Sequence, residues 1–336
     1  MRYCMRNLEN MSGEEIAQAF ATLPQGVTTL DLSKNELGKK SGAELAQVFA
    51  AIPPGITTLD ICENYLSLKT GAELAQAFTA IPRGVTTLDL SRNALGKKSG
   101  AELVQAFTAM PQGVTTLNLS CSDLGNKSGA ELTQAFAALP QGLTTFNLSW
   151  NWLGKKSGAE LAQAFVAIPQ GVTTLDLSWN WLGEKSGAEL AQAFVALPQG
   201  VTTLDLRNNK FKKKSTEELT LIFEAIPQHV ACVTLTVQEL NQMSTEQRKA
   251  IQKRYPCAEQ IILVDAEDKN RKLNPTISRA DANVYVRFGF KGSAPSLFHT
   301  TSFFIAKNKN QVEKWRPDFE QQLHPALLNG INQFRG

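Results

Sequence analysis

The sequence predicts an α/β solenoid, in which a parallel sheet lines the concave side of stacked repeats and helices cover the convex side. The first observation is a period of 29 residues: strand-like segments begin at Val27, at Ile56 and then every 29 residues up to Val230. The second is an alternation of apolar and polar residues in each repeat, followed by a helix start signal. Since one such unit cannot bury its own apolar face, it has to stack on its neighbours.

Each repeat is expected to begin with a short strand. In the first complete repeat Val27, Leu30, Leu32 and Leu37 are apolar, and the alternation of Leu30 and Leu32 indicates one buried face. Asn35 is expected to be buried after the strand, because a carboxamide donates and accepts hydrogen bonds and can satisfy a turning backbone. The equivalent positions hold Asn64, Asn93, Ser122, Asn151, Asn180 and Asn209, and the serine predicts a locally looser repeat.

A helix is expected after each strand. Ser41 is followed three residues later by Glu44, and this capping box recurs in every repeat and predicts a helix N-terminus. Leu45 and Phe49 follow at helical spacing, so we expect them to face the sheet. Pro53 ends the helix, because its ring cannot continue the hydrogen-bond ladder.

The repeat frame continues to about residue 265, which predicts a solenoid over 1–265 and a C-terminal α+β cap or extension over 266–336. A solenoid end exposes apolar surface, so we expect this tail to cover it. A secretion signal or a small effector module is the alternative. Within the tail, 284–290 and 297–306 alternate like strands, and 311–333 has the pattern of two short helices.

Composition narrows the function classes. The chain has 34 basic and 31 acidic residues, a net charge of +3, which gives no reason to expect nucleic-acid binding. No stretch approaches the ~18 apolar residues of a membrane span. The five cysteines are odd in number and show no metal-binding spacing, which favours a reducing, cytosolic compartment and predicts no metal and no cofactor.

Catalysis has little support in the sequence. His229, His299 and His324 are scattered, and no glycine-rich phosphate loop is present. Cys257 could serve as a nucleophile with His299 or His324 as its base, but a cysteine in a turn before a strand is the favoured interpretation. We therefore predict a protein that is not an enzyme.

The tryptophans are the residues that differ most between repeats. Trp150, Trp152, Trp179 and Trp181 flank the asparagine column in adjacent repeats, and polar residues fill the same positions elsewhere. A core role is therefore disfavoured, and an exposed aromatic patch usually marks a partner site. Packing against the chain's own tail is the alternative. The full set of predicted partner-binding residues comprises Trp150, Trp152, Trp179, Trp181, Tyr65, Asp89, Asp176, Asp205 and Arg207.

Charged side chains also form columns along the stack. The strand positions that face the concave side hold Asp31, Asp60, Asp89, Asn118, Asn147, Asp176 and Asp205. This stripe is either a repeated, solvated strand residue or a surface that steers a basic partner. On the opposite edge, before the helices, are Lys39, Lys40, Lys97, Lys98, Lys155, Lys156 and Lys212–Lys214. We interpret most of these lysines as promoting solubility and weak electrostatic interactions.

The frame L-x-x-L-x-L-x-x-N-x-L over about 1–265 resembles the leucine-rich-repeat proteins of the ribonuclease-inhibitor-like subclass. The near-identical segments Gly-Val-Thr-Thr-Leu-Asp-Leu-Ser and Ser-Gly-Ala-Glu-Leu-Ala-Gln-Ala-Phe are also similar to leucine-rich-repeat effectors that Legionella-type bacteria inject into host cells. In the first of these families aromatic residues near the strand ends commonly contact a protein ligand, which implies that role for the tryptophan positions.

These resemblances imply a monomeric virulence protein that leaves the bacterium by type IV secretion and acts in the host cytoplasm. Its partner would be a host protein or another bacterial effector enzyme, which it would bind and could inhibit. An adaptor whose C-terminal tail carries an activity, or recruits an enzyme, is the rival interpretation.

Overall fold

The computed structural model describes residues 1–268, 270–292 and 305. The chain forms two compact units, Met1–Leu235 and Thr236–Gly336. The division at residue 265 that the repeat frame suggests stays a prediction.

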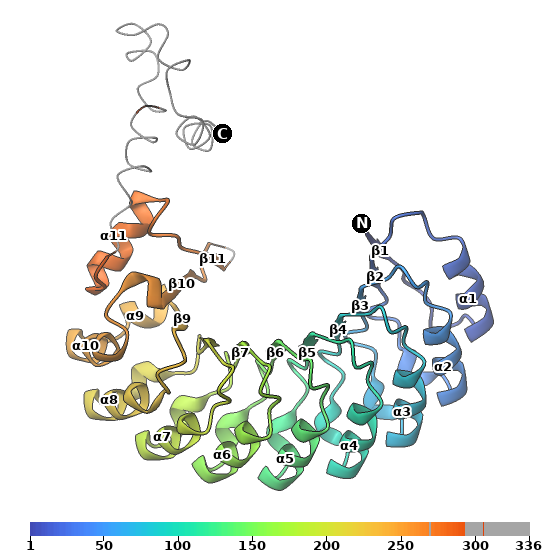
Figure 1. The fold of residues 1–336 in the computed structure, drawn as a ribbon, viewed down its shortest axis with the longest axis horizontal. Helices are drawn as coiled ribbons and strands as arrows, with labels where there is room; N and C mark the ends of the chain where they lie inside the picture. Colours follow the sequence, from blue (N-terminus) through green and yellow to red (C-terminus); the bar gives the residue numbers. More distant parts are fainter. Residues whose placement is uncertain (269, 293–304, 306–336) are drawn as a thin grey trace, which may run out of the picture. The chain divides into compact units, whose positions relative to one another are not determined.

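The first unit is a stack of repeats whose strands pair in parallel and in chain order. Leu30 lies opposite Leu59, and Leu59 lies opposite Leu88; all three are fully buried. The predicted sheet and its buried face are therefore confirmed, and Figure 1 shows the strands along the inner side of this unit. The strands are β1 Arg2–Cys4, β2 Thr29–Asp31, β3 Thr58–Asp60, β4 Thr87–Asp89, β5 Thr116–Asn118, β6 Thr145–Asn147, β7 Thr174–Asp176, β8 Thr203–Asp205 and β9 Cys232–Thr236.

The helices of the first unit lie outside the sheet (Figure 1). Ser41 Oγ accepts from Glu44 N, and the Glu44 carboxylate accepts from Ser41 N, so the predicted capping box is confirmed. Leu45 and Phe49 are fully buried. The helices are α1 Gly13–Ala21, α2 Gly42–Ala50, α3 Gly71–Thr79, α4 Gly100–Thr108, α5 Gly129–Ala137, α6 Gly158–Val166, α7 Gly187–Val195 and α8 Thr216–Ala225. Short 3₁₀ turns precede α2 to α8, at η1 Leu37–Lys39, η2 Leu66–Leu68, η3 Leu95–Lys97, η4 Leu124–Asn126, η5 Leu153–Lys155, η6 Leu182–Glu184 and η7 Phe211–Lys213.

The asparagine column joins one repeat to the next. Asn180 is fully buried, and its Nδ2 donates to Leu148 O at 2.9 Å and to Leu177 O at 3.1 Å. Its Oδ1 accepts from Asn151 N at 2.9 Å and from Leu153 N at 3.2 Å. The predicted burial of this carboxamide and its hydrogen bonds to the turning backbone are confirmed, and the structure adds that one side chain satisfies backbone groups of two repeats.

Ser122 cannot fill this role because a hydroxyl is shorter and has no carbonyl oxygen. Its Oγ donates to Ser120 O at 3.3 Å. The backbone N–H groups that face it belong to Asn93 and Leu95, and within the described part of the chain neither donates to the Ser122 side chain. The predicted loosening of this repeat has a structural basis in these missing hydrogen bonds.

A ladder of lysine and glutamate side chains also joins the repeats. Lys98 Nζ donates to Lys69 O of the preceding repeat at 2.8 Å and pairs with Glu102 Oε1 at 3.1 Å. Glu102 in turn accepts from Ser99 N and from Gly71 N of the preceding repeat. The backbone hydrogen bond from Ser99 is the main reason that the pKa of Glu102 is lowered to about 2, although burial opposes it.

The interpretation of these lysines as promoters of solubility is wrong for the second lysine of each pair. Side chains of this kind lie buried or half-buried, with Nζ on a backbone carbonyl of the preceding repeat, at Lys40, Lys98 and Lys156. The first lysine of each pair is exposed, at Lys39, Lys97 and Lys155. Sequence alone did not distinguish them, because both are lysines and only the backbone direction after the 3₁₀ turn differs.

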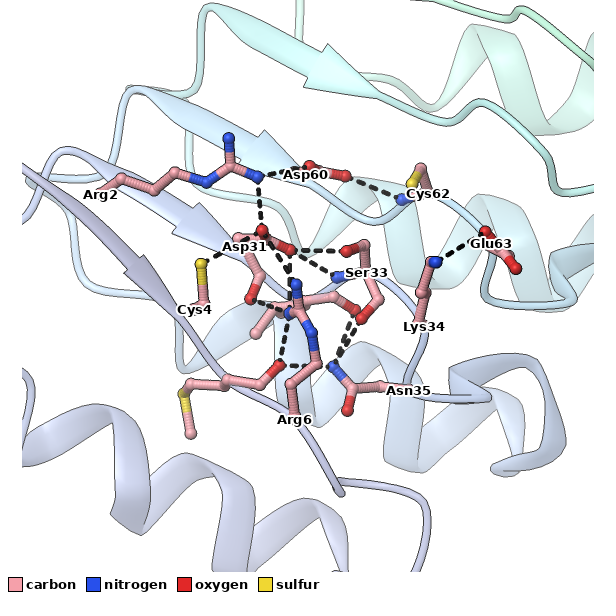
Figure 2. A network of polar contacts seen from close by, with 12 residues as sticks. Arg2, Cys4, Arg6, Asp31, Ser33, Lys34, Asn35, Asp60, Cys62 and Glu63 are labelled. Carbon is pink, nitrogen blue, oxygen red and sulfur yellow. Dashed lines mark hydrogen bonds and ion pairs between the residues drawn. The ribbon is translucent and has the colours of Figure 1, made fainter.

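A polar network closes the N-terminal end of the first unit, as Figure 2 shows. Asp31 is buried, and it accepts hydrogen bonds from Arg6, Arg2 and Ser33. Burial raises the pKa of the Asp31 carboxyl, but these hydrogen bonds together hold it well below its ordinary range. Arg2 also reaches Asp60 at 3.4 Å. The first carboxylate of the acidic column is therefore neutralised by the chain itself.

The second unit has a small core of its own. Its elements are α9 Val237–Asn241, α10 Thr245–Arg254, η8 Ala258–Gln260, β10 Ile261–Asp265, β11 Arg271–Lys272 and α11 Arg279–Phe288, and β10 pairs with β11 in antiparallel fashion. The buried Tyr285 hydroxyl donates to Ile261 O and accepts from Leu263 N, both at 3.0 Å. Strand β10 ends at Asp265, where the repeat frame of the sequence also ends.

The strand predicted over 284–290 is wrong, because these residues lie largely in α11. Asp281, Ala282, Tyr285 and Phe288 are buried at helical spacing, and Gly289 ends the helix in the left-handed region at φ 86°. The apolar residues of this segment fit both the alternation of a strand and the spacing of a helix. The residues that cap the two ends decide in favour of the helix. The segments predicted at 297–306, apart from residue 305, and at 311–333 lie outside the described residues.

Candidate functional site

The tryptophans occupy two turn positions with an unusual backbone. Trp150, Trp152, Trp179 and Trp181 all have left-handed φ values of 57° to 58°. Every complete repeat has a residue with positive φ at each of these two positions, for example Lys34 at 58°. Asparagine at the position between them fixes this turn, so the side chains on either side are held at the end of the strand and point away from the core.

The rings form two rows that run from one repeat to the next. In the first row Trp150 stacks on Trp179, with ring centres 4.3 Å apart and planes inclined by 13°. In the second row Trp152 stacks on Trp181 at 6.3 Å and 24°. Trp150 is 42% exposed, Trp179 36% and Trp181 40%. We call these two pairs the tryptophan rows.

Lysines cover the outer faces of the second row. Lys155 Nζ lies 4.3 Å from the centre of the Trp152 ring and donates to Asn126 Oδ1 in the preceding repeat. Lys210 Nζ, from the following repeat, lies 4.1 Å from the centre of the Trp181 ring. An ammonium over an indole face is attracted by the π electrons, so these lysines fix the orientation of both rings.

The acidic residues beside the rows also accept hydrogen bonds from the backbone. Asp176 Oδ1 accepts from Ser178 N at 2.8 Å, and Asp205 Oδ1 accepts from Arg207 N at 3.0 Å. Asp176 and Asp205 are direct neighbours in paired strands. Burial raises the pKa of Asp176, and the charge of Asp205 raises it further. Arg207 forms an ion pair with Asp205 at 2.8 Å, which reduces the negative charge at that end.

The remaining predicted residues lie apart from the tryptophan rows. Tyr65 is 49% exposed at the second turn position of an earlier repeat and does not join the tryptophans. Asp89 accepts from Ser91 N at 2.8 Å and from Asn118 Nδ2 at 2.8 Å. The structure therefore groups the tryptophans with Asp176, Asp205 and Arg207 on neighbouring repeats, and places Tyr65 and Asp89 further along the stack.

Among the described residues, no group of histidine, cysteine and acidic side chains is arranged to hold a metal ion. Cys257 directly precedes η8 and β10, in the turn that the sequence predicted. Its hypothetical partners His299 and His324 lie outside the described residues. None of the described helices is long and apolar enough to cross a membrane.

Sequence reasoning missed two features of this site. The left-handed turns contain no glycine, so the residue types at these positions did not indicate a positive φ. The lysine caps on the second row depend on side-chain direction, which a spacing pattern does not encode. A usable signal did exist at Gly125 and Gly154, because a Cβ at these positions would collide with the backbone of Trp152 and Trp181 respectively. The glycine of the preceding repeat thus permits a close approach to the backbone of each tryptophan turn.

Comparisons with known proteins agree with this architecture. A sequence model of the Leucine Rich repeat family matches residues 27–46 and 172–191. The crystal structure of the leucine-rich repeat-containing protein LegL7 from Legionella pneumophila is similar at a TM-score of 0.77 and 40% identity, and the match covers 88% of this chain and 92% of that chain. The curated proteins include no match to this sequence. The chain therefore belongs to the leucine-rich-repeat proteins.

Proposed function

We propose that this chain is a binding module that captures a protein partner through the tryptophan rows. Leucine-rich repeats generally form protein-binding modules without enzymatic activity. The observation that carries the proposal is the exposure of Trp150, Trp179 and Trp181, each more than a third accessible although it is stacked on another indole. Large exposed aromatic groups are typical of interface hot spots.

The rows are also prepared for binding before a partner arrives. The asparagine column fixes the backbone on either side of each tryptophan, and Lys155 and Lys210 hold the rings of the second row. Binding therefore immobilises few additional rotamers, so little conformational entropy is lost. A stiff aromatic surface of this kind favours a slow dissociation rate.

The acidic neighbours support a second, weaker role in association. Asp176 has no ion-pair partner in the described part of the chain, whereas Asp205 is paired with Arg207. A net negative potential beside the rows favours a basic surface on the partner. Replacing Asp176 and Asp205 by asparagine should mainly slow association, with an effect that fades in high salt.

The biological setting of this proposal is a bacterial effector that acts in the host cytoplasm as a monomer. Its partner is a host protein or another effector enzyme, which it inhibits or recruits by covering a surface. The similarity to a protein of Legionella pneumophila supports this setting. Tyr65 and Asp89, which lie further along the stack, extend the contact if the partner spans several repeats.

The proposal is tested by comparative capture from a host-cell lysate. The bait variants are wild type, a protein with all four tryptophans of the rows replaced by alanine, and a Val166→Ala, Val195→Ala control. The control removes exposed apolar side chains at 62% and 66% exposure from the same repeats, at the ends of α6 and α7. We expect the control to retain every protein that wild type captures specifically.

The tryptophan variant should lose those same proteins while its circular dichroism and unfolding midpoint match wild type. If the folded variant captures them as well as wild type does, the interface lies elsewhere on the chain. If the variant unfolds, the tryptophans are packing residues, and that result also contradicts the proposal.

A further inference from the structure

The two tryptophan rows differ in how their outer faces are covered. The second row is covered at both ends, by Lys155 on the side of the preceding repeat and by Lys210 on the side of the following repeat. In the first row, Trp150 stacks on Trp179 with one face. Within the described residues, no other ring and no cation covers its second face, which points toward the preceding repeat.

The neighbour of Trp150 on that side is Cys121, which occupies the same turn position one repeat earlier. The two residues have nearly the same backbone, with φ 52° at Cys121 and 58° at Trp150, so their side chains leave the turn in the same direction. Their backbones follow equivalent paths, because Cys121 N donates to Ser149 O as Trp150 N donates to Ser178 O. A thiol fills far less of the row than an indole does, so we expect a gap in the row above Cys121.

The next position in the row is Arg92, whose side chain is exposed. Burial raises the pKa of the Cys121 thiol, the charge of Arg92 opposes this rise, and the charge of Asp123 adds to it. Both charged groups therefore lie close to Cys121. Adjacent parallel strands are about 4.8 Å apart, so Trp150 and Arg92 belong to positions about 10 Å apart. This separation admits one planar ring with about 4 to 5 Å on either side, similar to the 4.3 Å between Trp150 and Trp179.

We infer that the gap between Trp150 and Arg92 is a stacking slot that receives one aromatic side chain, a tyrosine or tryptophan, from the protein partner. The inference rests on the proposed protein-binding function and specifies which group of the partner enters the rows. We call this gap the Cys121 slot.

The charges around the Cys121 slot select an aromatic ring over a guanidinium. A ring in the slot stacks on Trp150 and presents its other face to the Arg92 cation, which is a favourable cation–π arrangement. An arginine side chain would instead bring two cations face to face. Asp123, half-buried at the second turn position of the same repeat as Cys121, offers a carboxylate that can accept from a phenol or an indole N–H.

The inference is tested by nuclear magnetic resonance on the full chain, with N-acetyl-tyrosinamide as the probe and N-acetyl-alaninamide as its control. The observed signals are the indole N–H resonances of the tryptophans in the rows. We expect the tyrosine probe to shift the Trp150 signal in a saturable manner and to shift the Trp181 signal much less, because Lys210 covers that ring. The alanine probe should shift neither.

Two substitutions at the floor of the slot form a matched pair. Cys121→Ser keeps the gap and should leave the probe affinity within about twofold of wild type, whereas Cys121→Leu fills the gap and should weaken binding roughly tenfold. Arg92→Ala should weaken it roughly two- to fivefold, the scale of an exposed cation–π contact. Lys34→Ala, at the same turn position in a distant repeat, should have no effect.

The inference is overturned if Cys121→Leu binds the probe as wild type does, or if Trp181 shifts as strongly as Trp150. It is also overturned if adenosine shifts Trp150 more strongly than the tyrosine probe, because the slot then suits a nucleobase. If the probe fails while the folded tryptophan variant still loses its captured proteins, the slot is wrong and the proposed function stands. If the probe binds as expected while capture is independent of the tryptophans, the slot stands and the proposed function is wrong.

Discussion

At the scale of single residues, a buried carboxamide stabilises the turns of the repeats except at Ser122, and the sequence predicted it. The asparagine column follows from a simple requirement, because a turning backbone in the interior needs a side chain that donates and accepts. Asn180 makes hydrogen bonds in both directions and is fully buried. The identity of the residue was therefore sufficient to predict its role.

Asn180→Ala should lower the free energy of unfolding by roughly 1–3 kcal/mol, because it leaves buried backbone groups without partners. Chemical denaturation measures this change. The chain offers a reciprocal test at the interrupted position, since Ser122→Asn should restore the missing bonds and raise the unfolding midpoint. An Asn180→Ala protein as stable as wild type would show that the column does not support the turns.

A second prediction concerns Asp176, whose pKa is raised by burial and by the neighbouring Asp205. A carboxyl with a raised pKa in the folded state destabilises the fold where it is ionised, and this cost disappears as the pH falls below its ordinary pKa of about 4. Asp176→Asn should therefore stabilise the protein at neutral pH by roughly 0.2–1 kcal/mol, the scale of a cross-strand like-charge pair. Asparagine already fills this position at Asn118 and Asn147, where its Oδ1 accepts the same backbone N–H.

Thermal unfolding of Asp176→Asn and wild type at pH 7 and at pH 3.5 checks the sign. The stabilisation should be present at pH 7 and absent at the lower pH. A variant that is destabilised at pH 7 would mean that the charge of Asp176 supports the fold.

At the scale of elements, the strands and the helices of the first unit were predictable, whereas the links between repeats were not. The 29-residue period predicted the strands and the capping box predicted the helices, because the same local signals recur in every repeat. The lysine ladder was missed, since Lys97 and Lys98 are identical in sequence terms and differ only in where the backbone directs them. The α11 helix was missed because its apolar residues fit two periods at once.

The ladder predicts opposite outcomes for two adjacent lysines. Lys98→Met removes hydrogen bonds to Lys69 O and Glu102 from a half-buried site and should cost roughly 1–3 kcal/mol of unfolding free energy. Lys97→Met, at an exposed position one residue earlier, should change it by less than about 0.5 kcal/mol. Equal effects of the two substitutions on the urea midpoint would argue against a structural role for the ladder.

At the scale of the whole molecule, the sequence predicted the solenoid but not the organisation of its C-terminal end. Truncation after Asp265 removes α11, whose Tyr285 hydroxyl bonds to Ile261 and Leu263 in β10. The remaining 236–265 segment would lose the buried side chains of α11 from its core. We expect the 1–265 fragment to aggregate or to unfold at a clearly lower temperature. A monomeric fragment with the midpoint of the full chain would show that 266–336 is an independent appendage.

The tryptophan rows were predictable as a set, because aromatic residues replaced polar ones at the same positions of neighbouring repeats. Their stacking, the lysine caps and the open face of Trp150 required coordinates, since they depend on rotamers and on the left-handed turns. Sequence thus identified the candidate site, and structure showed which of its ring faces are already covered by the chain's own side chains.

The most direct test of the protein-binding account is the dissociation constant of the captured partner for wild type and for Trp179→Ala. Trp179 stacks on Trp150 in the first row and is 36% exposed. The account predicts that the constant rises about 30- to 700-fold, the equivalent of roughly 2–4 kcal/mol for a hot-spot tryptophan, while the unfolding midpoint stays near that of wild type. A folded Trp179→Ala protein that binds the partner with the wild-type constant would contradict it.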